Sequence, residues 1–411
     1  MHKIEKILDF AEINKPILWG LFLSTIIFKH AVANIFLLIL LVLFCIQLLQ
    51  NRRIIMGKCF IPILIYFFWG IVSLFWTTDF SNTIKGIGIT FPLLAIPILI
   101  SQYATFGLDD IKKTIKTFSI CLLAYFLICL IYAGLIFVED RQMSHFFYHS
   151  LVSVFNNNAI YISLAVAICI LFVFSLPDKK VGDYFLIGLL AIFLLVLASK
   201  NIIITTFFLV VISLLRSKKN VKIYIIISAV ISVIIPLLIF LDNPIKQRFL
   251  AELHLNINQI LTGQDFFDYK FSGLEVRIFQ WRLMGEMIVN NQIGILGLGL
   301  HNVNYLLDQY FSYYNLYKGY FHINFHNQYL QTLGEIGFIG LALLLGVFAK
   351  IIFESLKYKN SYKILWVLLF MSSFLTESFL SRQKGVFLFA TAFSLLFMHK
   401  KSETTKDEIY S

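Results

Sequence analysis

The chain has 411 residues, of which 59% are hydrophobic and only 14% are charged. Soluble globular proteins carry about 25% charged residues, so this composition excludes an ordinary water-soluble fold and predicts an integral membrane protein. The net charge of +11 would suggest a nucleic-acid partner in a soluble protein. Here it follows from where lysine and arginine lie between apolar segments, so we expect membrane lipids and no nucleic acid as partners.

Apolar segments close to the bilayer-spanning length of roughly 20 residues recur along the whole chain. We therefore expect an all-α polytopic membrane protein with about twelve transmembrane helices in a single membrane domain over residues 1–411. Several of these segments are short, among them the first, the last and the closely spaced seventh and eighth. The expected spans cover residues 14–29, 33–50, 59–76, 85–102, 118–138, 159–176, 184–198, 202–215, 223–241, 335–353, 364–380 and 385–398.

Basic residues alternate with the spans and indicate the topology. They concentrate in one set of connections, which the positive-inside rule places in the cytoplasm together with both termini. The opposite, outer side then holds 77–84, 139–158, 198–201, 242–334 and 381–384. The cytoplasmic set covers residues 3–15, 52–58, 112–116, 179–180, 216–222, 357–363 and 400–401.

The outer segment 242–334 is about 90 residues long, far beyond an ordinary loop. Helical spacing of apolar residues predicts one helix over Leu274–Asn290 and a second over Val303–Tyr313, with Asn302 as its cap. Aromatic residues are dense between 305 and 329, as expected for a segment at the membrane interface. We expect a helical loop and no separate soluble domain.

The sequence shows no pattern for a bound metal or cofactor. All five cysteines lie in or beside apolar segments, which argues against a disulfide framework or a cysteine-based metal site. The histidines show no tight metal-binding spacing. We therefore expect neither a metal nor a cofactor.

The stretch from His326 to Gly340 begins polar and continues as an apolar segment. On one continuous helix, positions 326, 330, 333, 337 and 340 would share a face, with His326 at its top. Gly337 and Gly340 would let a neighbouring helix approach closely. His326 can accept a proton from a hydroxyl. The alternative is an ordinary membrane helix with a polar start.

Basic residues on the outer side are informative because they oppose the positive-inside bias. Three of these basic residues lie in short turns: Lys200, Arg382 and Lys384. Their side chains either extend toward the lipid headgroups or together bind a phosphate. Arg277 opens the 274–290 segment and is either a surface residue or a phosphate ligand. We expect Glu377 to pair with Arg382 or Lys384 and hold their turn. Asn156, Asn157 and Asn158 are expected to cap the next helix, with a sugar or phosphate contact as the alternative.

The fifteen residues from His326 to Gly340 resemble the signature of the O-antigen ligase and polymerase family. That signature is His, then Asn, Ser or Gln, nine residues, Gly, two residues, and Gly, Thr or Tyr, which His326, Asn327, Gly337 and Gly340 match. The resemblance covers roughly 60–400, with a family core at 184–345 and the strongest motif identity at about 270–345. It implies GT-C-like glycosyltransferases that work without a metal at the periplasmic face of the bacterial inner membrane, in lipopolysaccharide biosynthesis.

The resemblance also implies substrates and residue roles. Family members transfer a glycan from undecaprenyl diphosphate to a sugar hydroxyl, on lipid A core in ligases and on a second lipid-linked glycan in polymerases. The catalytic histidine corresponds to His326 and the diphosphate-binding arginine to Arg277. The family often carries Ser-Arg where this chain has Ser199-Lys200. Lysine keeps the positive charge but cannot form the two parallel hydrogen bonds that a guanidinium makes to a phosphate. We also expect Arg382 to bind the diphosphate and Asn327 and Lys384 to bind substrate.

Competing functions remain open from the sequence. Ligase and polymerase share the signature, so the acceptor is undetermined between them. The spans carry almost no charge in their middles, which argues against an ion-coupled transporter. A flippase for a lipid-linked glycan and a non-enzymatic membrane scaffold are the alternatives of other classes.

Overall fold

The structure is a computed structural model that describes residues 10–51, 57–102, 106–216, 250, 255–357 and 361–398. In this part every regular element is a helix and there is no strand. The expected span at 223–241 lies outside the described residues, as do most of the first residues of the expected outer loop, 242–249 and 251–254.

A helix, or a run of consecutive helices, is present at each expected span that the structure describes. Among the residues described, five helical segments are long and apolar enough to cross a membrane, namely Ala31–Leu49, Lys58–Phe75, Phe80–Ser101, Leu108–Asp140 and Gln328–Lys357. The other apolar helices are shorter. The all-helical, polytopic membrane architecture is therefore supported, while the number twelve and the GT-C-like class stay predictions. The apolar elements are α2 (Lys15–Ile27), α3 (His30–Asn51), η1 (Lys58–Phe60), α4 (Ile61–Val72), η2 (Ser73–Phe75), α5 (Phe80–Thr90), α6 (Pro92–Ser101), α7 (Leu108–Asp140), α9 (Ala159–Ser175), α10 (Val181–Val196), α11 (Lys200–Arg216), α17 (Gln328–Lys357), α18 (Ser361–Phe374) and α19 (Gln383–Met398).

The expected spans 85–102 and 118–138 differ in extent from the helices found there. The segment 85–102 is divided between α5 and α6, and Pro92 stands where α6 begins. Proline suits the first turn of a helix but cannot donate a backbone hydrogen bond to a preceding turn. The segment 118–138 is the later part of the 33-residue α7, whose first turn contains Asp109 and Asp110. The carboxylate of Asp110 accepts a hydrogen bond from Gly107 N (3.0 Å) and so starts the helix early.

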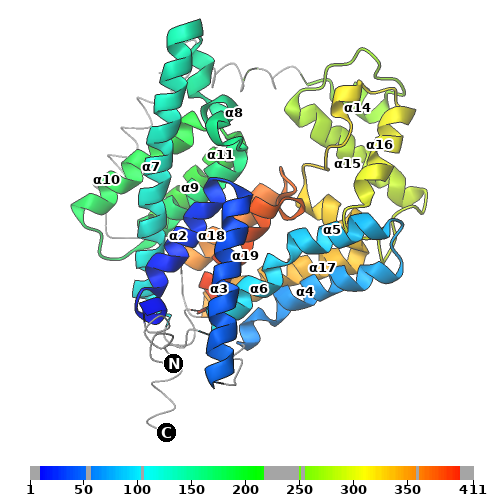
Figure 1. The fold of residues 1–411 in the computed structure, drawn as a ribbon. Coiled ribbons are helices and arrows are strands. Elements are labelled where there is room, and N and C mark those ends of the chain that lie inside the picture. The colour runs from blue at the N-terminus through cyan, green and yellow to red at the C-terminus, as the bar shows by residue number, and fades with distance from the viewer. Residues whose placement is uncertain are drawn as a thin grey trace.

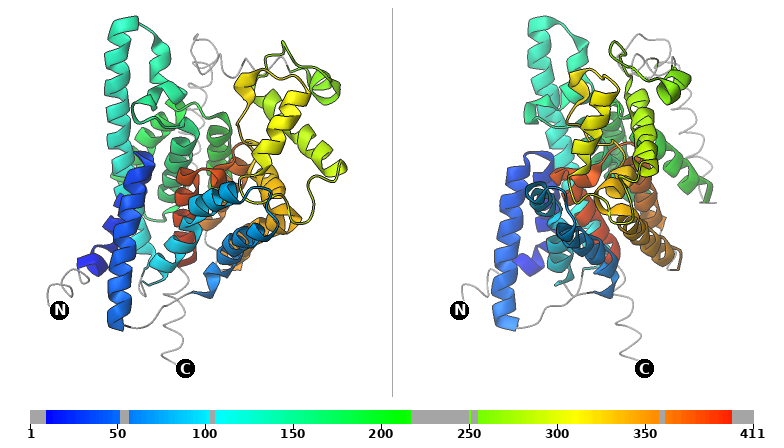
Figure 2. Two further views of the ribbon diagram at one scale, coloured as in Figure 1. Left: turned by 45° about the vertical axis from the view of Figure 1, so that its right-hand side comes forward. Right: turned by 90° about the vertical axis from the view of Figure 1, so that its right-hand side faces the viewer.

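Helix α9 is enclosed by other helices of the body, whose arrangement Figures 1 and 2 show. Its residues from Ala159 to Val173 are buried almost without exception, because it packs against α7, α10, α11 and α18. A helix that is apolar on every side is expected to be surrounded in this way. Trp366 on α18 donates its indole N–H to the carbonyl of Ile168 (3.0 Å) and ties the two helices together.

Within residues 255–325, three α-helices form a lobe at one side of the body, coloured yellow-green in Figure 1. These are α14 (Ile257–Thr262), α15 (Gly273–Val289) and α16 (Val303–Tyr313), which confirms the two helices expected here to within a residue. An aromatic core that includes Phe266, Phe279 and Phe311 holds the lobe together. The remaining short elements are η3 (Met143–Phe146), α8 (Tyr148–Leu151), η4 (Ser153–Phe155), η5 (Lys318–Tyr320) and η6 (Phe379–Ser381).

The start of α15 is fixed by a capping box. Ser272 Oγ accepts from Glu275 N (3.3 Å) and Glu275 Oε2 accepts from Ser272 N (2.7 Å), while Tyr269 donates its hydroxyl to Glu275 (2.7 Å). Burial raises the pKa of Glu275, but the hydrogen bonds from Ser272 and Tyr269 outweigh it and hold that pKa below its usual value. The carboxylate therefore stays ionised at neutral pH and anchors the helix that carries Arg277.

The side chain of Asn302 has a different role from the cap we expected. It makes no capping hydrogen bond at α16. Its amide instead donates to Thr83 Oγ1 (3.1 Å), to Thr77 Oγ1 (2.5 Å), and to the carbonyls of Asp79 and Leu298. Asn302 thereby ties the lobe to the turn between η2 and α5.

Helix α17 is broken, and the expectation of one continuous helix from His326 through Gly340 is wrong. Ile336 and Gly337 have non-helical backbone angles, with φ of +72° at Gly337. The chain from 295 to 299 lies in the break: Leu298 N donates to Gly334 O (3.0 Å) and Gly299 N to Glu335 O (2.7 Å). The indole of Trp69 donates to Ile336 O (3.0 Å). The break therefore leaves these three carbonyls paired, as membrane-buried backbone requires.

The two signature glycines consequently do not line one face for a neighbouring helix. A Cβ atom at Gly337 would collide with the backbone of Ile295 and Leu296, and one at Gly340 would meet the side chain of Ile336, four residues earlier on the same helix. Gly337 is required by its positive φ and by the close approach of a second backbone.

We predict that Gly337→Ala destabilises the protein by about 1–3 kcal/mol, because it forces a β-carbon into a left-handed conformation against another backbone. Gly346→Ala is the matched control, since Gly346 lies on the same helix with no atom in contact distance of an added methyl. Thermal unfolding in detergent measures both. Equal melting temperatures for the two variants would contradict the role of the break.

Candidate active site

His326 lies in the chain between η5 and α17, outside the helix at whose top we expected it. Its φ of +44° is left-handed, and α17 begins two residues later at Gln328. Its N–H donates to Asn324 Oδ1 (3.1 Å), and Gln280 of α15 donates to Asn324 O (2.8 Å). These bonds fix the histidine between the lobe and α17, with 32% of its side chain exposed.

Asn327 is the N-cap of α17. Its Oδ1 accepts from the backbone N–H of Tyr329 (2.9 Å) and of Leu330 (3.2 Å), and the residue is buried. Its own N–H donates to Ser378 Oγ (3.2 Å). Asparagine and serine are preferred N-cap residues. The need to cap α17 therefore explains why the signature has such a residue directly after the histidine. A role of Asn327 in substrate binding stays a prediction.

Glu377 contacts His326, contrary to the expected pairing with Arg382 or Lys384. His326 Nδ1 and Glu377 Oε2 are 3.4 Å apart, and the glutamate side chain is 5% exposed. Glu377 lies in the turn between α18 and η6. A carboxylate behind one ring nitrogen holds the imidazole in a fixed tautomer and leaves the other nitrogen for chemistry. The sequence drew attention to Glu377 but offered no signal for its partner, 51 residues away.

Arg277 reaches the same turn from α15. Its Nε donates to the carbonyl of Thr376 (3.1 Å), the residue before Glu377, and its Nη1 donates to Gly273 O (2.6 Å). No carboxylate pairs with this half-buried guanidinium among the residues described. His326 and Arg277 are therefore brought to neighbouring residues of one turn.

The start of α11 joins this turn from a third direction. Asn201 donates its amide to Thr376 Oγ1 (2.9 Å) and to Ser372 O (2.9 Å), and Thr205 shares a hydrogen bond with Ser372 (2.6 Å). Lys200 is the residue immediately before Asn201, so the structure places it at the α11 end that contacts this turn. Sequence reasoning did not identify Asn201. A polar residue at the start of an apolar helix was the available signal.

The remaining two expected cations differ in their surroundings. Arg382 follows η6 and is exposed. The amine of Lys384 donates to Phe28 O (3.1 Å) and to Asn157 Oδ1. Asn157 also donates to Tyr125 OH (2.8 Å). Lys384 thus ties α19 to the end of α2 and the start of α9, and these contacts favour a structural role.

Asn158 caps α9 as expected, since its Oδ1 accepts from Ile160 N (2.8 Å). Throughout the part of the chain that the structure describes, no three His, Cys, Asp or Glu residues are grouped to hold a metal ion. The turn holds an imidazole backed by a carboxylate and a guanidinium that, among the residues described, donates to backbone carbonyls. That combination suits proton transfer beside a developing anion.

Residues 184–345 match the model of the family described as O-Antigen ligase, and the match contains Lys200, Arg277 and the whole stretch from His326 to Gly340. Glu377 lies beyond it. No functionally curated protein matches the chain. The family match indicates a glycosyl-transferring enzyme that uses lipid-linked glycans, and the apolar helices agree with a membrane protein. The match thus supports the assignment of this chain to the O-antigen ligase and polymerase family.

Proposed function

We propose that the protein transfers a glycan from undecaprenyl diphosphate to a sugar hydroxyl, as an O-antigen ligase whose acceptor is lipid A core. The observation that carries this proposal is the shared turn at Thr376 and Glu377, which Arg277 and His326 both contact. The reaction takes place at the periplasmic face of the bacterial inner membrane. The lobe of α14, α15 and α16 faces the periplasm, and both termini face the cytoplasm.

In the proposed mechanism, the acceptor oxygen attacks the anomeric carbon of the donor sugar, whose bond to the diphosphate oxygen breaks. The acceptor proton moves to Nε2 of His326, because Nδ1 faces Glu377. The leaving diphosphate gains negative charge as the bond breaks. The guanidinium of Arg277 stabilises that charge by charge-assisted hydrogen bonds, with Lys200 and Arg382 as further cations, and no metal is needed.

His326→Asn is expected to lower the transfer rate about 10²–10⁴-fold, the usual contribution of a general base. Asparagine tolerates the left-handed backbone that His326 adopts, so the variant removes the imidazole without adding strain. His322→Asn is the control, because His322 also has a positive φ (+61°) and its side chain is 88% exposed. The assay is purified protein in liposomes with an undecaprenyl-diphosphate glycan.

The same assay separates the competing functions. Lipid A core and lipid-linked repeat units are offered in parallel, and lengthening of the second alone would make the enzyme a polymerase. A flippase would leave the glycan linkage intact in His326→Asn and change the sidedness of the lipid substrate. A scaffold would show no dependence on His326. Full inactivation by EDTA would exclude the metal-free mechanism.

Arg277→Gln is expected to reduce kcat/KM for the donor about 100-fold, because charge-assisted hydrogen bonds contribute about 1.5–3 kcal/mol each. Lys270→Ala is the control: it also removes one cation from the lobe, from an exposed position. Rates are measured with the donor varied at saturating acceptor. If the two variants lose activity to the same degree, general electrostatic attraction explains the effect and Arg277 does not bind the diphosphate.

Glu377→Gln is expected to lower kcat about 10–100-fold with the donor KM unchanged, because Glu377 positions His326 without touching substrate. This range is taken from carboxylates behind metal-bound histidines. Glu354→Gln is the control for loss of a buried carboxylate, since Glu354 is 4% exposed on the distant part of α17. A rise in donor KM with constant kcat would show that Glu377 acts on substrate binding instead.

A further inference from the structure

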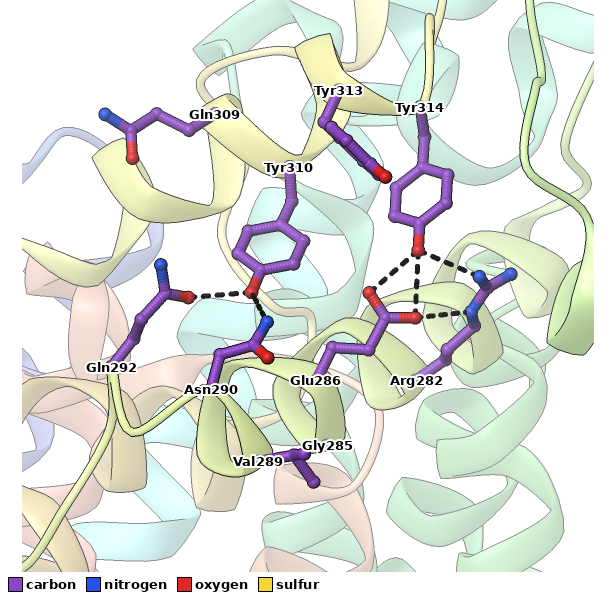
Figure 3. Close-up of a pocket in the computed structure, with 10 residues that line it drawn as sticks. All are labelled: Arg282, Gly285, Glu286, Val289, Asn290, Gln292, Gln309, Tyr310, Tyr313 and Tyr314. Atoms are coloured by element: carbon purple, nitrogen blue, oxygen red, sulfur yellow. Dashed lines mark hydrogen bonds and ion pairs between the residues drawn. The ribbon is translucent and has the colours of Figure 1, made fainter.

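A groove of about 720 Å³ lies between α15 and α16 in the outer lobe (Figure 3). It is separate from the turn at Thr376 and Glu377. Glu286, at its centre, is nine residues after Arg277 on the same helix, which at about 100° per residue is half a turn around and about 14 Å along the axis. The groove therefore opens on the face of α15 opposite Arg277. Its lining residues are Arg282, Gly285, Glu286, Val289, Asn290, Gln292, Gln309, Tyr310, Tyr313 and Tyr314.

One wall of the groove is a closed polar triad. Arg282 Nε donates to Glu286 (2.7 Å), Arg282 Nη2 donates to Tyr314 OH (2.9 Å), and Tyr314 donates to Glu286 (2.9 Å). Arg282 Nη1 also donates to the carbonyls of Ile260 and Gly263. Burial and the hydrogen bond to Glu286 raise the pKa of Tyr314, so its hydroxyl stays protonated. The guanidinium of Arg282 thus has its partners within the protein: Glu286, Tyr314 and two backbone carbonyls.

The rest of the groove offers neutral polar groups beside aromatic rings. Tyr310 donates its hydroxyl to Gln292 Oε1 (2.7 Å) and accepts from Asn290 Nδ2 (2.9 Å). The amide nitrogen of Gln292, the amide oxygen of Asn290 and both ends of Gln309 are left to bind a ligand. Tyr313 is 71% exposed, and Figure 3 shows its ring between those of Tyr310 and Tyr314.

These features select among ligand classes. The only cation of the lining is paired with the only anion, so a phosphate, a nucleic acid or an acidic glycan finds no free charge. Val289 is the only aliphatic side chain in the lining, so a lipid tail finds little apolar surface. A sugar matches both parts of the site: its C–H faces stack on tyrosine rings and its hydroxyls exchange hydrogen bonds with amides. The volume lies within the usual range for ligand pockets.

We propose that this groove binds a neutral glycan. Resting on the proposed transfer reaction, we assign it to sugars of the donor or acceptor that lie several residues away from the bond being made. A span of about 14 Å along α15, together with the path around the helix, suits sugars beyond the first two or three. The groove would then hold the glycan chain while its reacting end lies at the turn of His326 and Arg277.

Binding is tested with the protein in detergent and, as probe, the oligosaccharide released by mild acid from the host's own lipid-linked glycans. The wild type is expected to bind it, and Tyr313→Ala and Tyr310→Phe to bind about tenfold more weakly, as expected for the loss of about one hydrogen bond or ring contact. Tyr305→Ala is the control, because Tyr305 is equally exposed on α16 and lies outside the groove. No binding by the wild type, or equal binding by Tyr313→Ala and Tyr305→Ala, overturns the proposal.

A second measurement distinguishes the two sources of glycan. In the transfer assay, Tyr313→Ala is expected to raise KM about tenfold for the substrate whose glycan occupies the groove, either donor or acceptor, with kcat nearly constant. Unchanged KM for both substrates overturns the assignment to transfer.

The His326→Asn variant separates this inference from the proposed function. It is expected to bind the free oligosaccharide as the wild type does. If transfer depends on His326 but binding is insensitive to Tyr313, only the groove proposal fails. If binding depends on Tyr313 but transfer is insensitive to His326, the groove stands and the proposed mechanism fails.

Discussion

The interaction on which the structure depends is the pairing of the broken helix α17 with the chain at 295–299. A helix broken within an apolar body exposes carbonyls that have no water to bind. Leu298 and Gly299 supply two of the missing donors and Trp69 supplies a third. Because residues 295–299 lead directly into α16, the same bonds that repair the helix also fix the lobe above it. Two side-chain-free positions, Gly297 and Gly337, permit the backbones to approach this closely.

The site is assembled from segments that are far apart in the sequence around one short turn. The carbonyl of Thr376 accepts a hydrogen bond from Arg277, and the hydroxyl of Thr376 accepts one from Asn201. The next residue, Glu377, contacts His326. The turn is itself fixed by the start of α17, since Gln328 accepts from Leu380 N (2.6 Å) and Ser378 accepts from Asn327 N. Geometry at the histidine therefore depends on the ends of α11, α15, α17 and α18 together.

Much of this fold could be predicted from hydropathy and capping. The apolar helices follow from segment length, and α15 and α16 follow from helical spacing because their apolar faces pack in a small aromatic core. The break at Gly337 could not be predicted, since a glycine in an apolar helix has the same local pattern whether it permits helix packing or a left-handed bend. The contact of Glu377 with His326 could not be predicted from the sequence either, because it depends on which helix ends meet in space. Asn327, in contrast, has the composition and position of an N-cap and could have been identified as one.

Helix α15 carries Arg277 at its beginning and the groove residues Glu286 and Asn290 at its end, and its start is anchored by Ser272 and Glu275. A seventeen-residue helix of this kind behaves as a stiff rod over the lengths involved. The nine residues from Arg277 to Glu286 therefore set a fixed separation of about 14 Å along the helix axis. If the groove holds the glycan as we propose, this helix acts as a ruler: only a chain long enough to span that separation can occupy the groove while its reacting end lies beside Arg277.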